Sequence, residues 1–252
     1  MAIFGARLPV SRDEFDWLIA CFAWLRLVLD DAGRQLGSLL PDDPRLRDAA
    51  TAGSLFEVVR DHCDMADWPV RLQQIDDAFR TSDIREVKEI AGPLGTYSGN
   101  GDAAVIQYSG ALLRNPDALT ATLAHELAHY LLEGRGDPPG GPDLLEHATD
   151  CAVVYLGCGI FLANSARHFE QFTDGERSGW RSSASGYLSE QALVCATALA
   201  ATLNGHDVQA IGAHLKPYLR RDFRKACKAI AREHPSLEKA LAAVDLLVWN
   251  YG

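Results

Sequence analysis

Two histidines four positions apart are the residues of this chain best suited to chemistry. His125-Glu126-Leu127-Ala128-His129 forms an HExxH motif. In an α-helix, residues four apart lie one turn apart on the same face, so both imidazoles can bind one metal ion. Glu126 lies beside the pair and can reach a water molecule on that metal, where it would act as a general base and not as a ligand. The spacing therefore predicts a metal site with Glu126 as its catalytic residue.

The alternative interpretation of the motif is two ordinary histidines on a core helix. The neighbouring residues favour the metal site, because Glu126 is the only Asp, Glu, Lys or Arg between Thr120 and Tyr130. A stripe of leucines lies about half a turn from the His pair, so the helix can bury one face and direct the other at a cleft. These leucines are Leu119, Leu123, Leu127 and Leu131.

Residues 122–131 (TLAHELAHYL) resemble the extended active-site signature of the zincin metallopeptidases. That signature has Val or Thr three residues before the first His and an apolar residue at its end, which Thr122 and Leu131 match. The continuation typical of the metzincin subgroup is absent. Leu132 occupies the position of its Gly, and Arg135 that of its third His. The resemblance covers roughly residues 100–165 and implies zinc-dependent hydrolysis of peptides.

A catalytic zinc ion takes three protein ligands and one water, so a third ligand is required. Glu146 and Asp150 are four residues apart and therefore share one face of the next expected helix. This pattern looks like the gluzincin subgroup, which implies Glu146 as the third ligand. Asp150 would then accept a hydrogen bond from the far nitrogen of one ligand His and fix its tautomer. The alternative is Asp150 as the ligand itself, as in zincins with a downstream Asp.

An enzyme of this type also needs a group that stabilises the oxyanion of the tetrahedral intermediate. The resemblance implies a Tyr or His beyond the second ligand helix, and Tyr187 and His206 are the candidates. The alternative is that both are ordinary loop residues. Residues 149–165 (TDCAVVYLGCGIFLANS) are also similar to segments of bacterial proteins with HELAHYLL-like motifs, which implies kinship and no activity.

The elements that would hold these residues follow from caps, periodicity and breakers. Asn115, Pro116 and Asp117 open the motif helix, which we expect to end near Glu133. A loop of Gly and Pro follows, and then a second helix. The expected segments are the loop 134–143, the second helix 143–163, strands at 68–73 and 103–109, and a surface loop at 165–187.

Further helices are expected at both ends of the chain. Ser11 and Glu14 form a capping box that begins a helix reaching Leu29. The others are expected at 44–62, 189–203, 207–215, 218–233 and 236–248. The predicted fold is α+β and mostly α: a zincin-like core of a small sheet, the HExxH helix and the ligand helix, with N- and C-terminal helices. Residues 1–188 would form the metal-binding region and 189–252 a helical region, packed together as one domain.

Composition limits the partners and the compartment. The 252 residues are 48% hydrophobic and 23% charged, which is typical of a globular protein. Since 24 basic and 34 acidic residues give a formal charge of −10, we expect neither nucleic acid nor a membrane as a partner. No signal peptide or membrane span is expected. Six scattered cysteines without a Cys-x-x-Cys pair favour free thiols and a cytoplasmic protein.

The sequence thus predicts a zinc-dependent hydrolase acting on a peptide or protein substrate. Zn2+ would be held by His125, His129 and Glu146, and Glu126 would take a proton from the zinc-bound water and return it to the leaving amine. Two alternatives stay open. One is a non-catalytic protein that zinc stabilises, and the other is a regulatory protease or binding module with one dedicated partner, docked on the helices at 189–248.

Overall fold

The computed structural model describes residues 8–29, 37–75, 95–98, 104–170, 187–247 and 249. This part of the chain is mostly helical with one small sheet, so the predicted α+β, mostly α class is confirmed. Its helices are α1 (Arg12–Val28), α2 (Pro44–Asp48), α3 (Ala52–His62), α4 (Pro116–Leu132), α5 (Leu145–Tyr155), α6 (Gly159–Glu170), α7 (Glu190–Leu203), α8 (Val208–His214), α9 (Arg220–Glu233) and α10 (Leu237–Ala242). The strands are β1 (Val70–Ile75), β2 (Gly95–Ser98) and β3 (Ala104–Ser109), and short 3-10 helices span Gly110–Arg114 and Pro142–Leu144.

The sheet has three strands in the order β1-β3-β2. β1 runs parallel to β3 with Val70 opposite Ala104, and β2 runs antiparallel to β3. Along β3 the side chains of Ala104, Ile106 and Tyr108 are buried, as expected for a strand with one face on the core. Both predicted strands are present, the first shifted by two residues. β2 was not predicted.

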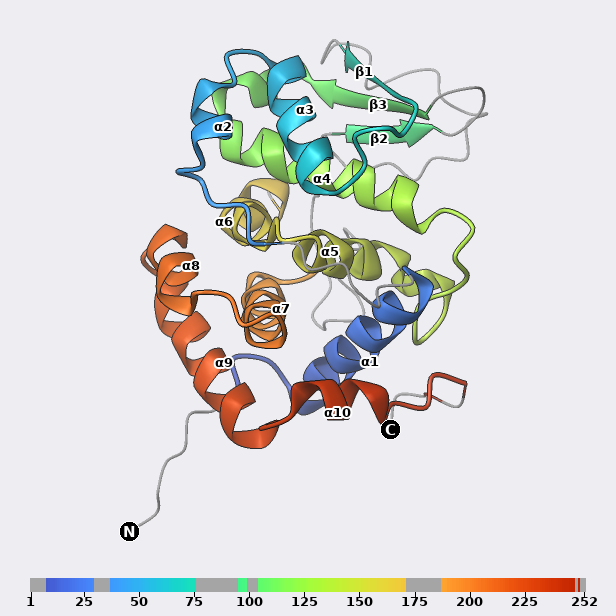
Figure 1. Cartoon of the computed structure of the whole chain (residues 1–252), viewed down its shortest axis with the longest axis vertical. Helices are drawn as coiled ribbons and strands as arrows, with labels where there is room; N and C mark the ends of the chain where they lie inside the picture. The colour runs from blue at the N-terminus through green and yellow to red at the C-terminus, as the bar shows by residue number, and fades with distance from the viewer. Residues whose placement is uncertain are drawn as a thin grey trace.

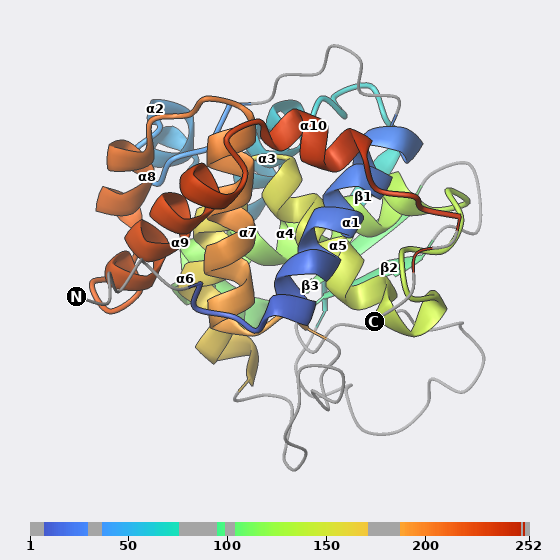
Figure 2. The same cartoon turned by 90° about the horizontal axis from the view of Figure 1, so that it is seen from below.

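Most of the helices lie in layers beneath the sheet, whereas α2 and α3 lie at its level at the top of the view (Figure 1). α4 contacts β2 and β3 on one side and α5 and α6 on the other, and α3 also packs on it. α7 contacts α5 and α6 in the next layer, and α9 packs against α7. Figure 2 shows α1 and α10 on the side away from the sheet, where α10 contacts α1 and α1 contacts α5. α4 is therefore an interior helix.

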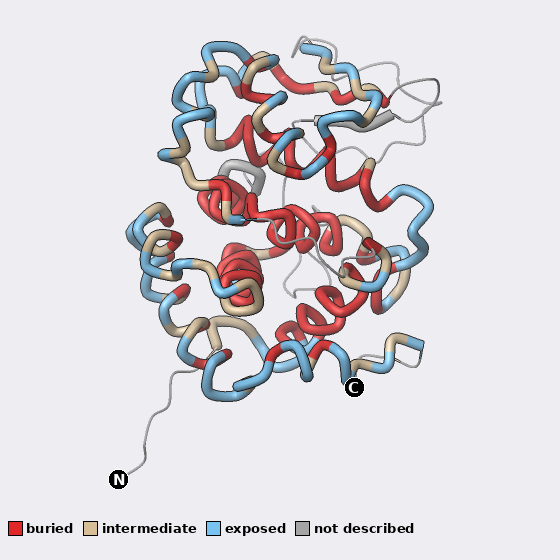
Figure 3. Tube along the Cα trace, in the orientation of Figure 1, coloured by how far each residue is buried: buried red, intermediate tan, exposed pale blue. Residues whose placement is uncertain are grey.

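Burial of α4 is more complete than the leucine stripe predicts. From Ala118 to Leu132 every residue is buried except Tyr130, which is half-buried. Figure 3 shows the same for most of α5 and α7. The expectation of one buried face and one face on an open cleft is wrong, because the sheet and α3 cover one side of α4 while α5 and α6 cover the other.

Two predicted helices are each divided in two. The helix expected at 44–62 is α2 and α3, because Thr51 begins a new helix: its side chain accepts from the backbone N–H of Ser54 at 3.1 Å. The helix expected at 143–163 is α5 and α6, separated at Gly157, whose φ of +89° ends the first of them. α6 reaches Glu170, so the loop expected from 165 begins too early, and its remainder, 171–186, lies outside the described residues.

The C-terminal helices are present, although α10 ends at Ala242 and not near 248. One hydrophobic cluster joins the regions 1–188 and 189–252, since it includes Trp17, Leu127 and Leu193 together with Phe223. Within the described part of the chain, none of the helices combines the length and the apolar character that crossing a bilayer would require.

Candidate metal centre

α4 and α5 bring the candidate ligands together. Asn115 accepts a hydrogen bond from the Ala118 N–H at 3.2 Å and Pro116 occupies the first turn, so the sequence fixes where α4 begins. The loop after α4 leads through the 3-10 turn Pro142–Leu144 directly into α5. Because α4 and α5 pack against each other, the first turn of α5 faces the last two turns of α4.

Three side-chain atoms converge between these helices. His125 Nε2 lies 3.0 Å from His129 Nε2 and 3.3 Å from Glu146 Oε2. His129 Nε2 is 3.4 Å from the same Glu146 oxygen. Among the described residues these three form a group able to hold a metal ion. Both histidines are buried, and Glu146 is half-buried at the edge of the cluster.

These separations fit a tetrahedral ion. Nitrogen and oxygen ligands about 2.0–2.2 Å from a tetrahedral zinc ion are about 3.3–3.5 Å apart. The three observed separations of 3.0, 3.3 and 3.4 Å approach the edges of one face of that tetrahedron. The donor set of two imidazoles and one carboxylate also suits zinc. The residues present therefore fit the metal that the motif implies.

Asp150 lies behind His125 and outside this group. Its Oδ1 is 3.1 Å from His125 Nδ1, and its Oδ2 accepts the backbone N–H of Leu188 at 2.9 Å. A proton on Nδ1 that is donated to Asp150 leaves the Nε2 lone pair of His125 directed at the cluster. Of the two carboxylates weighed from the sequence, Glu146 contributes an oxygen to the cluster and Asp150 orients an imidazole.

Thr149 is a member of the site that the sequence analysis did not single out. Its Oγ1 donates to the carbonyl oxygen of Leu145 at 2.9 Å and lies 3.4 Å from His129 Nδ1. The hydroxyl oxygen can therefore accept a hydrogen bond from Nδ1–H, which would fix the second imidazole as Asp150 fixes the first. Its position three residues after Glu146 places it on the same helical face, and that spacing is the signal that could have identified it.

The carboxylate of Glu126 is buried beside the His pair. The residue is 1% exposed, and its Oε2 has no hydrogen-bond partner among the described residues. A buried carboxylate oxygen without a partner is costly unless a ligand or water completes the site. Burial raises the pKa of Glu126 to about 8, and the negative charge of Glu146 adds to this while His125 opposes it.

The three ligand candidates shift one another's pKa values. Burial disfavours the charged form of His125, but hydrogen bonds to Asp150 and Glu146 outweigh it and raise the His125 pKa to about 10. Burial also acts on Glu146, yet its hydrogen bonds with both imidazoles hold its pKa well below the usual range. Burial lowers the pKa of His129. Glu146 is therefore favoured in its charged form, which is the form in which a carboxylate binds a metal ion.

Only one of the two oxyanion candidates lies near the cluster. The Tyr187 ring centroid is 5.2 Å from that of His125, and burial together with nearby carboxylates raises the Tyr187 pKa, so its hydroxyl keeps its proton. Tyr187 precedes α7, whereas His206 follows it. Since 14 helical residues span about 21 Å, the two candidates are at opposite ends of that helix. His206 Nδ1 lies 2.9 Å from Ser38 Oγ.

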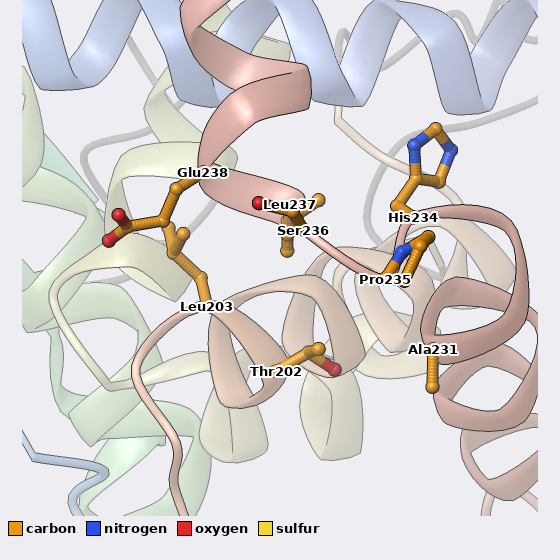
Figure 4. A pocket seen from close by; sticks show the side chains of 8 residues that line it. All are labelled: Thr202, Leu203, Ala231, His234, Pro235, Ser236, Leu237 and Glu238. Carbon is orange, nitrogen blue, oxygen red and sulfur yellow. The ribbon is translucent and has the colours of Figure 1, made fainter.

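Two cavities differ in their relation to the cluster. One, of about 340 Å³, lies at the C-terminal end of α4 and has His129 in its wall. The other, of about 330 Å³, lies between α7 and the turn from α9 to α10 (Figure 4). In that view the imidazole of His234 points away from the other labelled side chains, and the ring is 5.6 Å from that of Phe15. The first cavity is the one beside the candidate chemistry.

Comparison with known proteins identifies no relative of this chain. No protein-family model matches the sequence, and no curated protein or solved structure is significantly similar to it. The argument for function therefore depends on the arrangement of side chains in the site itself.

Proposed function

We propose that this protein is a zinc-dependent hydrolase of the zincin type that cleaves peptide bonds. The observation that carries the proposal is the convergence of His125 Nε2, His129 Nε2 and Glu146 Oε2 within 3.4 Å of one another, in an HExxH helix and the helix that follows it. The buried Glu126 oxygen without a partner supports a reaction that needs a base at this place. The oriented imidazoles support a site prepared for metal.

In this proposal, different residues of the site have different roles in hydrolysis. Zinc held by His125, His129 and Glu146 would supply Lewis-acid chemistry and would make water a nucleophile near neutral pH. Glu126 takes the proton of the attacking water and passes it to the leaving amine. Burial raises the pKa of Glu126 to about 8 even against the opposing charge of His125, and a metal cation beside it would lower that pKa and favour the proton-accepting carboxylate. Tyr187 donates its phenolic proton as a hydrogen bond to the developing oxyanion.

The first test is a comparison of zinc content with peptide cleavage. We expect one zinc per chain in protein purified without chelator and reloaded with zinc. Glu126→Gln should retain this zinc and the folded state but lose at least about 100-fold in the cleavage rate of a random-sequence peptide pool, because the general base is gone. Glu238→Gln, an exposed substitution of the same type on α10, is the matched control and should change neither quantity.

The outcomes separate this function from its alternatives. A zinc content well below one after reloading would contradict the metal site itself. Full zinc content with no cleavage by the wild type, together with a large fall in melting temperature on chelation, would support a structural zinc that ties α4 to α5. Cleavage of one copurifying protein only, with the peptide pool left intact, would support a regulatory protease with a dedicated partner.

A further inference from the structure

Charge is distributed unevenly along the chain, and its most basic part is α9 with the turn before it. Between Lys216 and Arg232 lie seven of the 24 basic residues and one of the 34 acidic residues. This segment therefore carries a formal charge of +6, while the rest of the chain carries −16. The overall charge of −10 conceals a basic surface.

The fold turns the basic side of α9 outward. Phe223 and Ile230 are buried, and α9 packs against α7, which lies between α9 and α5 (Figure 1). Arg221, Arg224 and Lys228 are exposed. Because they are three and four residues apart, they follow one face of the helix, with successive Cβ atoms about 5–6 Å apart. We call these three residues the α9 stripe.

The α9 stripe has no counter-charge from the protein. Asp222, the only acidic residue between Lys216 and Arg232, is paired with Lys225 at 2.8 Å. In the described ranges of the chain, no carboxylate forms an ion pair with a member of the α9 stripe. Arg224 uses its Nε to donate to a backbone carbonyl one turn earlier, at 3.2 Å, which leaves the outer nitrogens of its guanidinium free of carboxylates.

The charges of α9 are arranged at a cost to the helix. Every two charged residues of α9 that are four positions apart are both basic. Like charges at this spacing destabilise a helix, whereas opposite charges stabilise it. Arg221 also lies in the first turn, where the helix dipole disfavours a cation. A face that only had to remain in solvent would be more stable with some carboxylates at these positions, and an external anion would relieve the repulsion.

We propose that the α9 stripe binds an acidic segment of another protein, in which several Asp or Glu carboxylates lie close together. Guanidinium groups bind carboxylates through paired hydrogen bonds, and two of the three cations are arginines. The stripe is about 10 Å long, so a segment of a few residues covers it. This inference goes beyond the proposed hydrolase and does not depend on zinc, because α7 and α5 lie between α9 and α4.

Two other anionic partners fit this surface less well. A helix that lies on a membrane inserts its apolar face, but the apolar face of α9 is already buried in the protein. Duplex DNA extends far beyond a stripe of about 10 Å, so its other phosphates would meet the rest of a molecule that carries −16. A short acidic segment meets the cations alone.

Fluorescence anisotropy with a labelled peptide of alternating glutamate and alanine tests the surface. The full-length protein should bind this peptide at low salt, bind it more weakly as salt increases, and ignore the same peptide with glutamine in place of glutamate. In the triple variant Arg221→Gln, Arg224→Gln, Lys228→Gln the affinity should fall about tenfold, since each exposed ion pair contributes about a two- to fivefold factor.

A matched control removes the same charge elsewhere. Arg47, Arg71 and Arg114 are exposed and lie on other elements, so replacing all three with glutamine changes the net charge equally. This variant should keep its affinity for the glutamate peptide within about twofold, because charges farther away than a Debye length are screened.

A single variant separates binding from helix stability. Lys228→Glu places a carboxylate four residues from both Arg224 and Arg232, so it should raise the melting temperature of the free protein. The same variant should weaken binding of the glutamate peptide about tenfold. A stabilised protein with unchanged peptide affinity would show that the stripe is only a solvated face, and would overturn the inference.

Other results would also overturn it. These are failure of the wild type to bind the glutamate peptide at low salt, and equal losses of affinity in the stripe variant and the control variant. Tighter binding of a short DNA duplex or of phosphatidylglycerol vesicles than of the peptide, lost in the stripe variant, would assign α9 to a phosphate-bearing partner instead. None of these results bears on the proposed hydrolase, whose zinc content and cleavage are measured separately.

Discussion

Each imidazole of the HExxH pair has its two nitrogens directed at different partners. The Nε2 atoms of His125 and His129 meet at the cluster, while their Nδ1 atoms face Asp150 and Thr149 respectively. This arrangement selects the tautomer that leaves Nε2 free to bind a metal. The geometry therefore gives different roles to Glu146 and Asp150, two carboxylates on one face of α5 whose spacing alone does not tell them apart.

The metal affinities of three variants test this distinction. Glu146→Ala should lose most of the zinc, because one of the three proposed protein ligands is removed. Asp150→Asn should keep the fold and weaken zinc binding by about 10–100-fold, the usual effect of losing the partner of a ligand imidazole. Thr149→Val should weaken zinc binding less than Asp150→Asn does. The Thr149–His129 hydrogen bond that it removes is longer, at 3.4 Å, than the 3.1 Å contact between Asp150 and His125. Competition with a chromophoric zinc chelator gives the three affinities.

The order of these affinities can contradict the assignment without any knowledge of the substrate. If Asp150→Ala removes the zinc while Glu146→Ala retains it, the roles of the two carboxylates are reversed. Asp143→Asn is the control for a carboxylate near α5 that lies outside the cluster, and its zinc affinity should equal that of the wild type.

At the scale of elements, α5 is oriented by the close approach of another segment at its C-terminal end. Gly157 has φ of +89°, and a Cβ built on it would lie 2.2 Å from the carbonyl oxygen of Gly37 and 2.9 Å from His62 Nε2. The Gly157 carbonyl in turn accepts the N–H of Leu39 at 3.0 Å. Only glycine allows both this backbone conformation and this contact.

Gly157→Ala is therefore expected to destabilise the protein by about 2–5 kcal/mol, adding the cost of a left-handed conformation to that of overpacking. Gly205→Ala is the matched control, because Gly205 has φ of +64° but open space around a built Cβ. It should cost only about 1–2 kcal/mol. Urea unfolding measures both values. Equal losses in the two variants would show that the close approach contributes nothing.

The elements that the sequence predicted correctly are those with a local signal. Ser11, Asn115 and Ser189 each cap a helix that begins at the next residue, and the segment at 103–109, rich in Val, Ile and Tyr, contains β3. The breaks at Thr51 and Gly157 were missed, although both residue types were visible. A cap or a glycine inside an apolar run ends a helix only when tertiary contacts favour the break.

What the sequence could not provide comes from distant parts of the chain. The four residues of β2 pair only with β3 among the described strands, so their conformation depends on a partner and not on their own pattern. The second hydrogen bond to Asp150 comes from Leu188, 38 residues later. The burial of α4 likewise requires the sheet and three helices, α3, α5 and α6, to be placed around it. The HExxH pair and its two downstream carboxylates were predictable from their spacing, whereas the choice between Glu146 and Asp150 as the carboxylate of the cluster stayed open until their positions were known.

At the scale of the whole molecule, the cysteines are distributed through the hydrophobic core. Cys21, Cys63, Cys151, Cys158 and Cys195 are each 0% exposed, and all six cysteines are free thiols. Cys227 is half-buried, and burial raises its pKa to about 11, so it forms little thiolate near pH 8. Native protein should therefore react slowly with a thiol reagent at one position, and the denatured, unreduced protein should react at six.

The same thiols test whether residues 1–188 and 189–252 unfold together. Cys195 lies in the second region and packs in one hydrophobic cluster with Cys21 and Cys151 of the first. In a single cooperative unit all five buried thiols become reactive at the same urea concentration. We expect this result from pulsed alkylation followed by peptide mass spectrometry. Exposure of Cys195 at a lower concentration than Cys21 would show that the C-terminal helices open as a separate unit. Four thiols in place of six in the denatured protein would instead indicate oxidation of one neighbouring pair. The candidates are Cys21 with Cys151 and Cys63 with Cys158, because the side chains of each pair are hydrogen-bonded.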